Sequence, residues 1–335
     1  NLRLGKVHAE RIQATPEFGW PYFSIPDTAL TTSGLSWHAR ARELVAGVVS
    51  ECGSHIDRDA PLFIASSSLS VGGLENGAPY LPDQQAFLEE VATWLDWRGP
   101  VLGVASACTS SMNALISATA MIEADLSEHA LVLGLELANH FTSAGFSGMQ
   151  LLATDLPRPL DPTRDGLVLG EAVAALYLGK QTSRWRVLGG ANRVNGENPV
   201  GADQGVVTQM IAQVLDECGL APAQIDLIKL QAAGSPQNDA EEIAGLQESF
   251  SSLPPLVTFK AMMGHTLGAS GAAELALLMG CLESGVWPAI IPQTIDPQLA
   301  VQTCAAPPQP CRRMLANILG FGGGHSCLVI EDTTQ

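Results

Sequence analysis

The chain has 335 residues, and its 34 acidic side chains against 17 basic ones give a formal net charge of −17. So large an acidic excess argues against a nucleic-acid backbone or an anionic membrane surface as the main partner, because neutralising phosphates requires clustered Lys and Arg. Hydrophobic residues make up 46% of the chain and charged residues only 15%. We therefore expect a large core together with an extensive subunit interface.

Short apolar runs alternate with helix-length segments along the whole chain, which is the pattern of βα units around buried sheets. The strands predicted for the first half cover residues 61–65, 101–104, 130–135 and 172–178. Those predicted for the second half cover residues 185–188, 225–230, 256–259, 314–317 and 326–330. Apolar residues recur about every 3.6 positions in the predicted helices, which cover residues 37–51, 84–95, 109–124, 205–218, 239–246 and 270–282.

The predicted helix 109–124 carries no charge before Glu123 and has apolar or small residues on every side. A helix of this kind is buried, so we expect it to run through the centre of the protein. Segments of comparable length lie on either side of residues 180–184. The sequence therefore predicts two similar halves, residues 1–179 and 180–335, related by a pseudo-repeat.

The seven cysteines are odd in number, lie far apart and include no C-x-x-C pair, which favours a reducing compartment over a disulfide framework. No His, Cys or carboxylate groups show metal-ligand spacing and no glycine motif is specific for a nucleotide, so we expect neither a metal nor a cofactor. No run reaches the roughly 18 apolar residues of a membrane span, and the start Asn1-Leu2-Arg3-Leu4 has no signal-peptide core. We expect a cytoplasmic protein that binds neither membrane nor nucleic acid.

Cys108 stands between a predicted strand and the predicted buried helix, in a tight turn of small residues. A thiol at the start of a helix meets the positive end of the helix dipole and free backbone N–H groups, both of which favour the thiolate. This placement is typical of a nucleophilic cysteine. Considered alone, Cys108 is explained more simply as a small buried apolar residue.

Two further segments add chemistry to the cysteine. His265 lies in a glycine-flanked turn directly before a predicted helix, five residues after Lys260. Lys260 comes at the end of a predicted buried strand, where its charge needs a partner, and we expect that partner to be Glu274 on the following helix. The loop 317–324 is rich in glycine, so its backbone can approach a ligand closely, and its aromatic residue Phe321 could gate a pocket.

Together these segments resemble the condensing enzymes of the thiolase superfamily, specifically the elongating β-ketoacyl-acyl-carrier-protein synthases. The resemblance rests on five segments in the order of the family's motifs, which are those around Cys108 and at residues 158–172, 234–239, 260–265 and 320–323. It covers about the last two thirds of the chain. The first hundred residues or so are shorter than usual in the family and lack its opening strand with a Gly-rich turn.

The resemblance implies an α/β protein with a five-layered αβαβα fold from two related halves, and a Cys–His–His centre for decarboxylative Claisen condensation. In that chemistry the cysteine accepts an acyl chain from a carrier protein, and two histidines support malonyl decarboxylation and stabilise the enolate oxygen. Carried over by position, Cys108 is the nucleophile and His265 is one of the two histidines. Lys260 and Glu274 form the supporting network.

The same resemblance assigns the surroundings of the reacting groups. Backbone N–H groups at the nucleophile and at Phe321 and Gly322 would hold the thioester oxyanion. Met112, Phe146 and Met149 are expected to line the acyl pocket. The length and saturation of the acyl chain depend on such pocket residues and on a partner subunit.

One position departs from the family pattern. Where the family has a His opening the segment His-Gly-Thr-Gly-Thr-Pro, this chain has Gln231, followed by Ala232-Ala233-Gly234-Ser235-Pro236. Gln can donate a hydrogen bond to an enolate oxygen but cannot become cationic near neutral pH. A catalytic donor of this kind is worth roughly 3 to 4 kcal/mol in the transition state, so its loss would lower the rate on the order of 100- to 1000-fold.

Three hypotheses follow. The preferred one is a chain-length-factor-like subunit, weak or silent in condensation, which pairs with an active ketosynthase in type II polyketide or aryl-polyene-like systems. The second is an active synthase with a Cys108–Gln231–His265 centre. The third is a non-catalytic scaffold that binds acyl chains. The expected partner is an active ketosynthase subunit, in a heterodimer, or a second copy of this chain, in a homodimer. The retained Cys108 departs from the best-known chain-length factors, which lack the cysteine.

An acyl carrier protein carrying acyl or malonyl groups is the expected second partner. Carrier proteins are acidic, and this chain has only four Lys and a net charge of −17. Long-range electrostatics therefore disfavours carrier docking on this subunit and leaves that task to a more basic partner. The charge balance supports the chain-length-factor-like hypothesis independently of Gln231.

Overall fold

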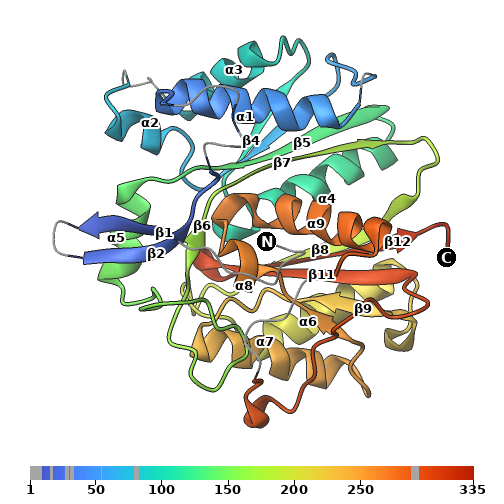
Figure 1. Ribbon diagram of the computed structural model, residues 1–335. Helices are drawn as coiled ribbons and strands as arrows, with labels where there is room; N and C mark the ends of the chain where they lie inside the picture. The colour runs from blue at the N-terminus through green and yellow to red at the C-terminus, as the bar shows by residue number, and fades with distance from the viewer. Residues whose placement is uncertain are drawn as a thin grey trace.

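The computed structural model describes residues 10–15, 18–26, 30, 34–53, 55–78, 83–287 and 294–335. Figure 1 shows that they form five layers, in the order helices, sheet, helices, sheet and helices. The predicted five-layered αβαβα fold is therefore confirmed.

The first sheet is built from the first half of the chain. Its strands are β3 (Leu62–Ala65), β4 (Val101–Val104), β5 (His129–Glu136) and β7 (Ala172–Gly179), in the spatial order β4-β3-β5-β7. Strand β3 runs parallel to β4 and β5, whereas β5 and β7 are antiparallel. Strands β3 and β5 are buried almost throughout, as expected for strands with helices on both faces of the sheet.

The second sheet is built from the second half. Its strands are β8 (Trp185–Val194), β9 (Leu227–Lys229), β10 (Leu256–Val257), β11 (Arg313–Gly320) and β12 (Gly324–Asp332), in the order β10-β9-β11-β12-β8. The order β10-β9-β11-β12 repeats the order β4-β3-β5-β7 of the first sheet. The second sheet has a fifth strand, β8, beside β12, whereas among the described residues no strand pairs with the corresponding outer edge of β7.

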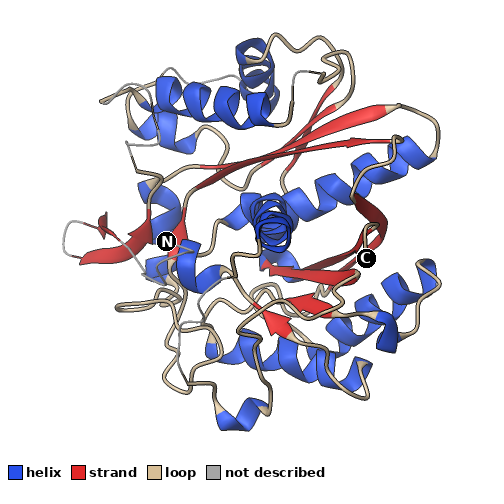
Figure 2. Ribbon diagram, turned by 45° about the vertical axis from the view of Figure 1, so that its right-hand side comes forward, coloured by secondary structure: helices blue, strands red, loops and turns tan. Residues whose placement is uncertain are grey.

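The middle layer carries Cys108, Ser270 and Glu274. It contains α4 (Ser110–Glu123) and α9 (Ser270–Ser284), preceded by the short 3₁₀ turns η2 (Ala107–Thr109) and η4 (Leu267–Ala269). Figure 2 shows these helices between the two sheets. The central position predicted for the apolar helix 109–124 is the position of α4. The helices touch at Gly271, because a Cβ there would come within 2.8 Å of the Met112 backbone nitrogen.

The remaining elements cover the sheets. Helices α1 (Trp37–Glu51) and α3 (Gln84–Trp94) lie over the first sheet, and α6 (Gln204–Glu217) and α7 (Pro236–Ser249) over the second. A small third sheet joins β1 (Glu10–Thr15), β2 (Phe18–Phe23) and β6 (Leu169–Gly170). The shorter helices are α2 (Val71–Glu75), α5 (His140–Gly148), α8 (Lys260–Met263), η3 (Pro222–Gln224), η5 (Pro297–Leu299) and η6 (Phe321–Gly323). In the part of the chain that the structure describes, no helix combines the length and the apolar character needed to cross a membrane.

Some predicted boundaries are wrong, each for a local reason. The strand predicted over 256–259 ends at Val257, and Lys260 begins α8 instead of closing a strand. The helix predicted over 239–246 begins at Pro236, because Ser235 caps its N-terminus and proline is well suited to the first helical position.

Candidate active site

Cys108 is held in a strained turn between β4 and α4. Ala107 has the left-handed backbone conformation, with φ of 51°, which is uncommon for a residue other than glycine. The hydroxyl of Ser110 fixes this turn, since its Oγ accepts from the Ser106 N–H at 2.9 Å and donates to the Ala107 carbonyl at 2.6 Å. Leu267 has the same left-handed conformation, with φ of 47°, at the start of the matching turn before α9.

Burial dominates the acidity of the Cys108 thiol. Only 4% of the residue is exposed, and this desolvation raises the pKa of the thiol to about 11. Backbone hydrogen bonds from Phe321 and from Cys108 itself, and the charge of Lys260, act in the opposite direction but do not outweigh it. The backbone N–H groups at the helix start thus act towards the thiolate, as expected, but their effect is outweighed because the turn also removes the sulfur from water.

His265 lies directly against the thiol. Its Nε2 is 3.0 Å from Sγ of Cys108, and its Nδ1 is 3.1 Å from Oγ of Ser270 at the start of α9. The turn before it depends on Gly264, whose φ of 70° and crowded surroundings exclude a Cβ. Burial, together with the charges of Lys260 and Lys229, holds the pKa of the imidazole well below its ordinary value. The ring is therefore neutral, and its Nε2 can exchange a proton with the thiol.

A fully buried ion cluster lies behind His265. Lys260 forms an ion pair with Oε1 of Glu274, as expected from the sequence, and also donates to Oγ of Ser270 at 3.1 Å. A second lysine, Lys229 from the end of β9, pairs with Oε2 of the same Glu274 at 2.8 Å. Glu274 thus carries two cations, and Ser270 connects the cluster to the imidazole.

Gln231 follows β9 and faces the same cavity as Cys108 and His265. It is 7% exposed, and its side-chain Oε1 is buried without a hydrogen-bond partner. Its backbone N–H donates to Oε1 of Glu242 at 2.7 Å, and the next N–H, of Ala232, donates to Oε2 at 2.8 Å. The loop that carries Gln231 is therefore fixed from below by a buried carboxylate of α7.

The glycine loop after β11 closes the other side of the cavity. Gly322 has φ of 79° and donates its N–H to the Pro199 carbonyl at 2.7 Å. Gly323 has no room for a Cβ, which would lie 1.9 Å from the Asn195 carbonyl oxygen. These contacts fix the backbone of Phe321, whose ring stacks on Phe146 of α5.

The cavity among these groups has a volume of about 30 Å³. This volume holds about one or two water molecules but no acyl chain. Among its walls are Cys108, His265, Gln231, Phe146 and Phe321. The structure therefore brings the predicted reacting residues together around one narrow pocket.

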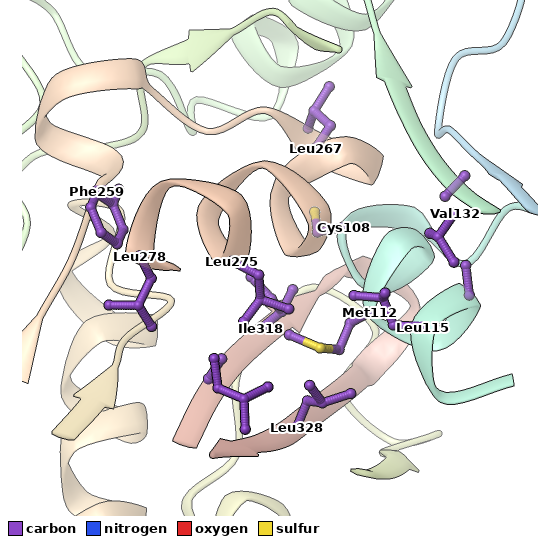
Figure 3. Close-up of a cluster of buried hydrophobic side chains, with 14 of the residues drawn as sticks. Cys108, Met112, Leu115, Val132, Phe259, Leu267, Leu275, Leu278, Ile318 and Leu328 are labelled. Atoms are coloured by element: carbon purple, nitrogen blue, oxygen red, sulfur yellow. The ribbon is translucent and has the colours of Figure 1, made fainter. Parts of the chain in front are cut away.

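The predicted pocket-lining residues differ in their positions. Phe146 borders the cavity, as expected. Met112 is fully buried below Cys108, among the core side chains between α4, α9 and β11 in Figure 3, and does not reach the cavity. Met149 is 47% exposed after the C-terminal end of α5 and is not among the residues that line this cavity.

Several residues of the site were missed in the sequence. They are Lys229, Ser270, the buried carboxylates Asp239 and Glu242 of α7, and Asn317 of β11, which donates to Glu242 at 2.7 Å. The two carboxylates are three residues apart and so share one face of α7. Their position on the apolar face of that helix is a signal that could have revealed them. In the described part of the chain no group of three or more His, Cys, Asp and Glu residues is arranged to hold a metal ion.

Family models match most of the chain. Residues 79–183 match the model described as "Beta-ketoacyl synthase, N-terminal domain", and residues 187–294 match "Beta-ketoacyl synthase, C-terminal domain". The two matches meet between β7 and β8, where the chain passes from the first sheet to the second.

Curated relatives are similar at about the same level. A protein named as actinorhodin polyketide beta-ketoacyl synthase 1 of Streptomyces coelicolor is 30% identical over 272 residues, which is 72% of this chain and 57% of that protein. The 3-oxoacyl-(acyl-carrier-protein) synthase 2 of Mycobacterium leprae is 29% identical over 245 residues, 67% of this chain and 58% of that protein. The chain thus spans somewhat more than half the length of these relatives.

Solved structures share the fold. A chain of "Ketosynthase (ApeO) in Complex with its Chain Length Factor (ApeC)" from Xenorhabdus doucetiae has a TM-score of 0.81 at 24% identity, over 99% of this chain and 92% of that one. A chain of "The ishigamide ketosynthase/chain length factor" has a TM-score of 0.80 at 20% identity, over 98% and 93%. These likenesses agree with the five layers described above.

Proposed function

Because this chain belongs to the β-ketoacyl synthase family, we propose that it acts in carrier-protein-dependent chain elongation as a chain-length-factor-like subunit, with weak or no condensing activity of its own. The observation that carries this proposal is Gln231. An amide that cannot titrate faces the reacting pair, in a place where the family has a histidine. The pocket remains, whereas one of its proton-handling groups is replaced.

Two features of the pocket support a non-catalytic resting state. The cavity has no room for an acyl chain while the Phe146 and Phe321 rings are stacked. The Cys108 thiol, with a pKa of about 11, is almost entirely protonated near neutral pH and is therefore a weak nucleophile. A partner that opens the pocket would change both features.

The edge of the first sheet supports a partner subunit. In the described residues no strand pairs with the outer edge of β4, and Leu102 on this strand is 37% exposed. An apolar unpaired edge is a template for pairing with another chain. We propose an active ketosynthase subunit as that chain, in line with the complex of ketosynthase and chain length factor from Xenorhabdus doucetiae.

The surface charge supports docking of the carrier protein on that partner. Arg312 and Arg313 form a neighbouring pair of cations, and both form ion pairs with Glu331, at 2.9 and 3.3 Å. Their charge is therefore partly offset before an acidic carrier protein approaches.

We also propose a domain boundary between residues 179 and 180. We further propose a cytoplasmic location, which is supported by the seven free cysteines.

One observation favours the alternative of an active synthase, which is the contact between Cys108 and His265. In that reaction the thiol would attack the carbonyl of a carrier thioester while Nε2 of His265 takes its proton. A new S–C bond forms at Cys108, the carrier sulfur leaves, and the imidazole returns the proton to it. In the condensing step Gln231 would then serve as a neutral donor to the enolate oxygen.

Intact mass spectrometry and co-purification separate these functions. The protein is incubated alone with acyl-loaded carrier protein, and the mass of an acyl adduct at Cys108 is sought with Cys108→Ala as the control. It is then co-expressed with a ketosynthase encoded by a neighbouring gene. No adduct alone, together with a stable complex that elongates chains, supports the proposal. Malonyl condensation by the isolated protein refutes it in favour of the alternative, and acyl binding without chemistry in either state indicates a scaffold.

A further inference from the structure

Lys229 is a buried cation that the chemistry proposed above does not use. It ends β9, is fully buried, and lies two residues before Gln231. Residues two apart on an extended backbone point to the same side, so Lys229 and Gln231 are directed towards the same layer of the molecule. Its ammonium reaches α9, where it bonds to Glu274 at 2.8 Å.

Because of Lys229, the cluster of Lys229, Lys260 and Glu274 carries a net positive charge. Glu274 is shared, since its other oxygen pairs with Lys260. Two ammonium groups and one carboxylate sum to a single excess positive charge, in a place without solvent to screen it. Glu242 is the other carboxylate whose charge acts on Lys229, and it belongs to the Gln231 side of the pocket.

The polar side chains around the His265 ring come from η2, α8, α9 and β9, whereas the segment around β6 contacts only the His265 backbone. Cys108 from η2 contacts Nε2, and Ser270 from α9 contacts Nδ1. Lys260 from α8 reaches Ser270 directly, and Glu274 and Lys229 lie behind it. Of these only the two lysines carry positive charge, and a positive charge disfavours a second one on the imidazole.

The cluster lies closer to the imidazole than to the thiol, because Ser270 connects it to Nδ1 of His265, whereas Cys108 contacts Nε2 on the other side of the ring. Both lysines lower the pKa of His265, and Lys260 also lowers that of Cys108. Removing the charge of Lys229 would therefore favour the imidazolium without an equal cost to the thiolate. The reacting pair would then move from neutral thiol and imidazole towards thiolate and imidazolium.

We propose that Lys229 is a positioning residue that gives the site a built-in excess of one positive charge, which keeps the imidazole of His265 neutral and its Nε2 available for the thiol proton. The inference rests on the proposed function only in taking Cys108 and His265 as the reacting pair. Lys229 sets the protonation state of this pair, whether or not the isolated chain catalyses condensation.

The test uses four proteins that differ only in cluster charge. Wild type carries one excess positive charge, Lys229→Met none, Glu274→Gln two, and the double variant Lys229→Met with Glu274→Gln one again. The His265 ring resonance, assigned with His265→Asn, is titrated by NMR. We expect the titration midpoint to move up in Lys229→Met and to return towards the wild-type value in the double variant. Lys180→Met, at an exposed ion pair with Asp125 and Glu128, is the matched control and leaves the midpoint unchanged.

A second measurement follows the effect of the cluster charge on the reactivity of the Cys108 sulfur. The rate of Cys108 alkylation by iodoacetamide at neutral pH, followed by intact mass, is expected to rise several-fold in Lys229→Met, on the order of tenfold at most. It should fall back in the double variant. Lys229→Met keeps the ion pair between Glu274 and Lys260, whereas the double variant leaves Lys260 as a buried cation without its carboxylate. Lys229→Gln therefore answers the same question where Lys229→Met alone fails to fold.

The outcomes separate this inference from the proposed function. A His265 midpoint that is the same in wild type and Lys229→Met, or one that moves in Lys229→Met and does not return in the double variant, overturns the role of Lys229. Neither readout involves condensation. Activity of the isolated wild-type chain would refute the proposed function and leave the assignment of Lys229 standing.

Discussion

Phe321 stacks on Phe146 with ring centroids 5.1 Å apart and ring planes inclined by 12°. One ring comes from the glycine loop after β11 and the other from α5, so the stack joins the two halves of the chain across the pocket. A stacked aromatic pair is worth about 0.5–1.5 kcal/mol beyond its buried area. That energy is small enough for a partner or a substrate to supply, and we propose that the stack acts as a gate.

Replacing Phe146 with Ala should open the gate. We expect Cys108 to react faster with a long-chain N-alkylmaleimide, relative to N-methylmaleimide, by about 2- to 12-fold, which corresponds to the energy of the stack. The matched control is Phe141→Ala, because Phe141 lies on the same helix but is 75% exposed. Intact mass gives both rates. Equal ratios in wild type and Phe146→Ala would mean that the stack does not restrict the pocket.

Most of the fold could be predicted because each half repeats one pattern of short apolar runs and amphipathic segments. The buried helix 110–123 was evident from its missing charges. Its opening turn was not, since the left-handed conformation of Ala107 depends on the hydrogen bonds of Ser110 and not on the local residue type. The end of β10 was missed for a similar reason, as the chain turns into α8 to bring Lys260 to Glu274.

Only those residues of the site that belong to recognisable sequence motifs could be predicted. Cys108, His265 and Gln231 stand in motifs and meet at one cavity. Lys229 lies in an ordinary apolar run, and nothing in that run indicates that it shares Glu274 with a lysine far along the chain. Met149 is the C-cap residue of α5 and is 47% exposed, which its residue type alone does not reveal.

The reactivity of Cys108 should depend steeply on pH. Its thiol pKa is raised by burial from 9.0 to about 11, and only the thiolate reacts with iodoacetamide. The alkylation rate should therefore increase about tenfold for each pH unit between pH 7 and 10, with no plateau in that range. A plateau below pH 9 would show that the sulfur is already a thiolate paired with imidazolium, contrary to the neutral pair described above.

Restoring a titratable ring at position 231 should restore chemistry. We expect Gln231→His to increase malonyl condensation by the isolated protein on the order of 100- to 1000-fold, which is the typical value of one catalytic donor. Gln237→His is the control, because Gln237 is exposed at the start of α7. Release of carbon dioxide from malonyl-loaded carrier protein measures the reaction. If Gln231→His shows no condensation while it folds and Cys108 remains alkylatable, the defect lies in the narrow pocket and not at residue 231.

Charge on the open edge of the first sheet should prevent assembly. Leu102→Lys places an ammonium on β4, and lysine on an edge strand opposes pairing with another chain. We expect loss of the complex with the ketosynthase partner in sedimentation or size-exclusion experiments, with unchanged thermal stability of the isolated subunit. Leu126→Lys, at a position 71% exposed in a turn, should leave the complex intact. An intact complex of Leu102→Lys would place the partner on another surface.

The buried carboxylate under the Gln231 loop should make the fold less stable as the pH rises. Burial raises the pKa of Glu242 from 4.5 to about 7, so the folded protein prefers the protonated acid more than the unfolded chain does. The stability that this preference adds is fully present below pH 4.5 and is lost as the pH rises through 7. Between pH 5 and 8 the loss amounts to about 2 to 3 kcal/mol.

Glu242→Gln imitates the protonated acid at every pH and should reduce the fall in stability by that amount. The free energy of unfolding, measured in urea at pH 5 and pH 8 for wild type and variant, gives the difference directly. Glu248→Gln, on the exposed side of the same helix, should keep the wild-type pH dependence. If Glu242→Gln loses as much stability between the two pH values as wild type does, the carboxylate is ionised throughout, and the loop that carries Gln231 is held by a charged group instead of a neutral acid.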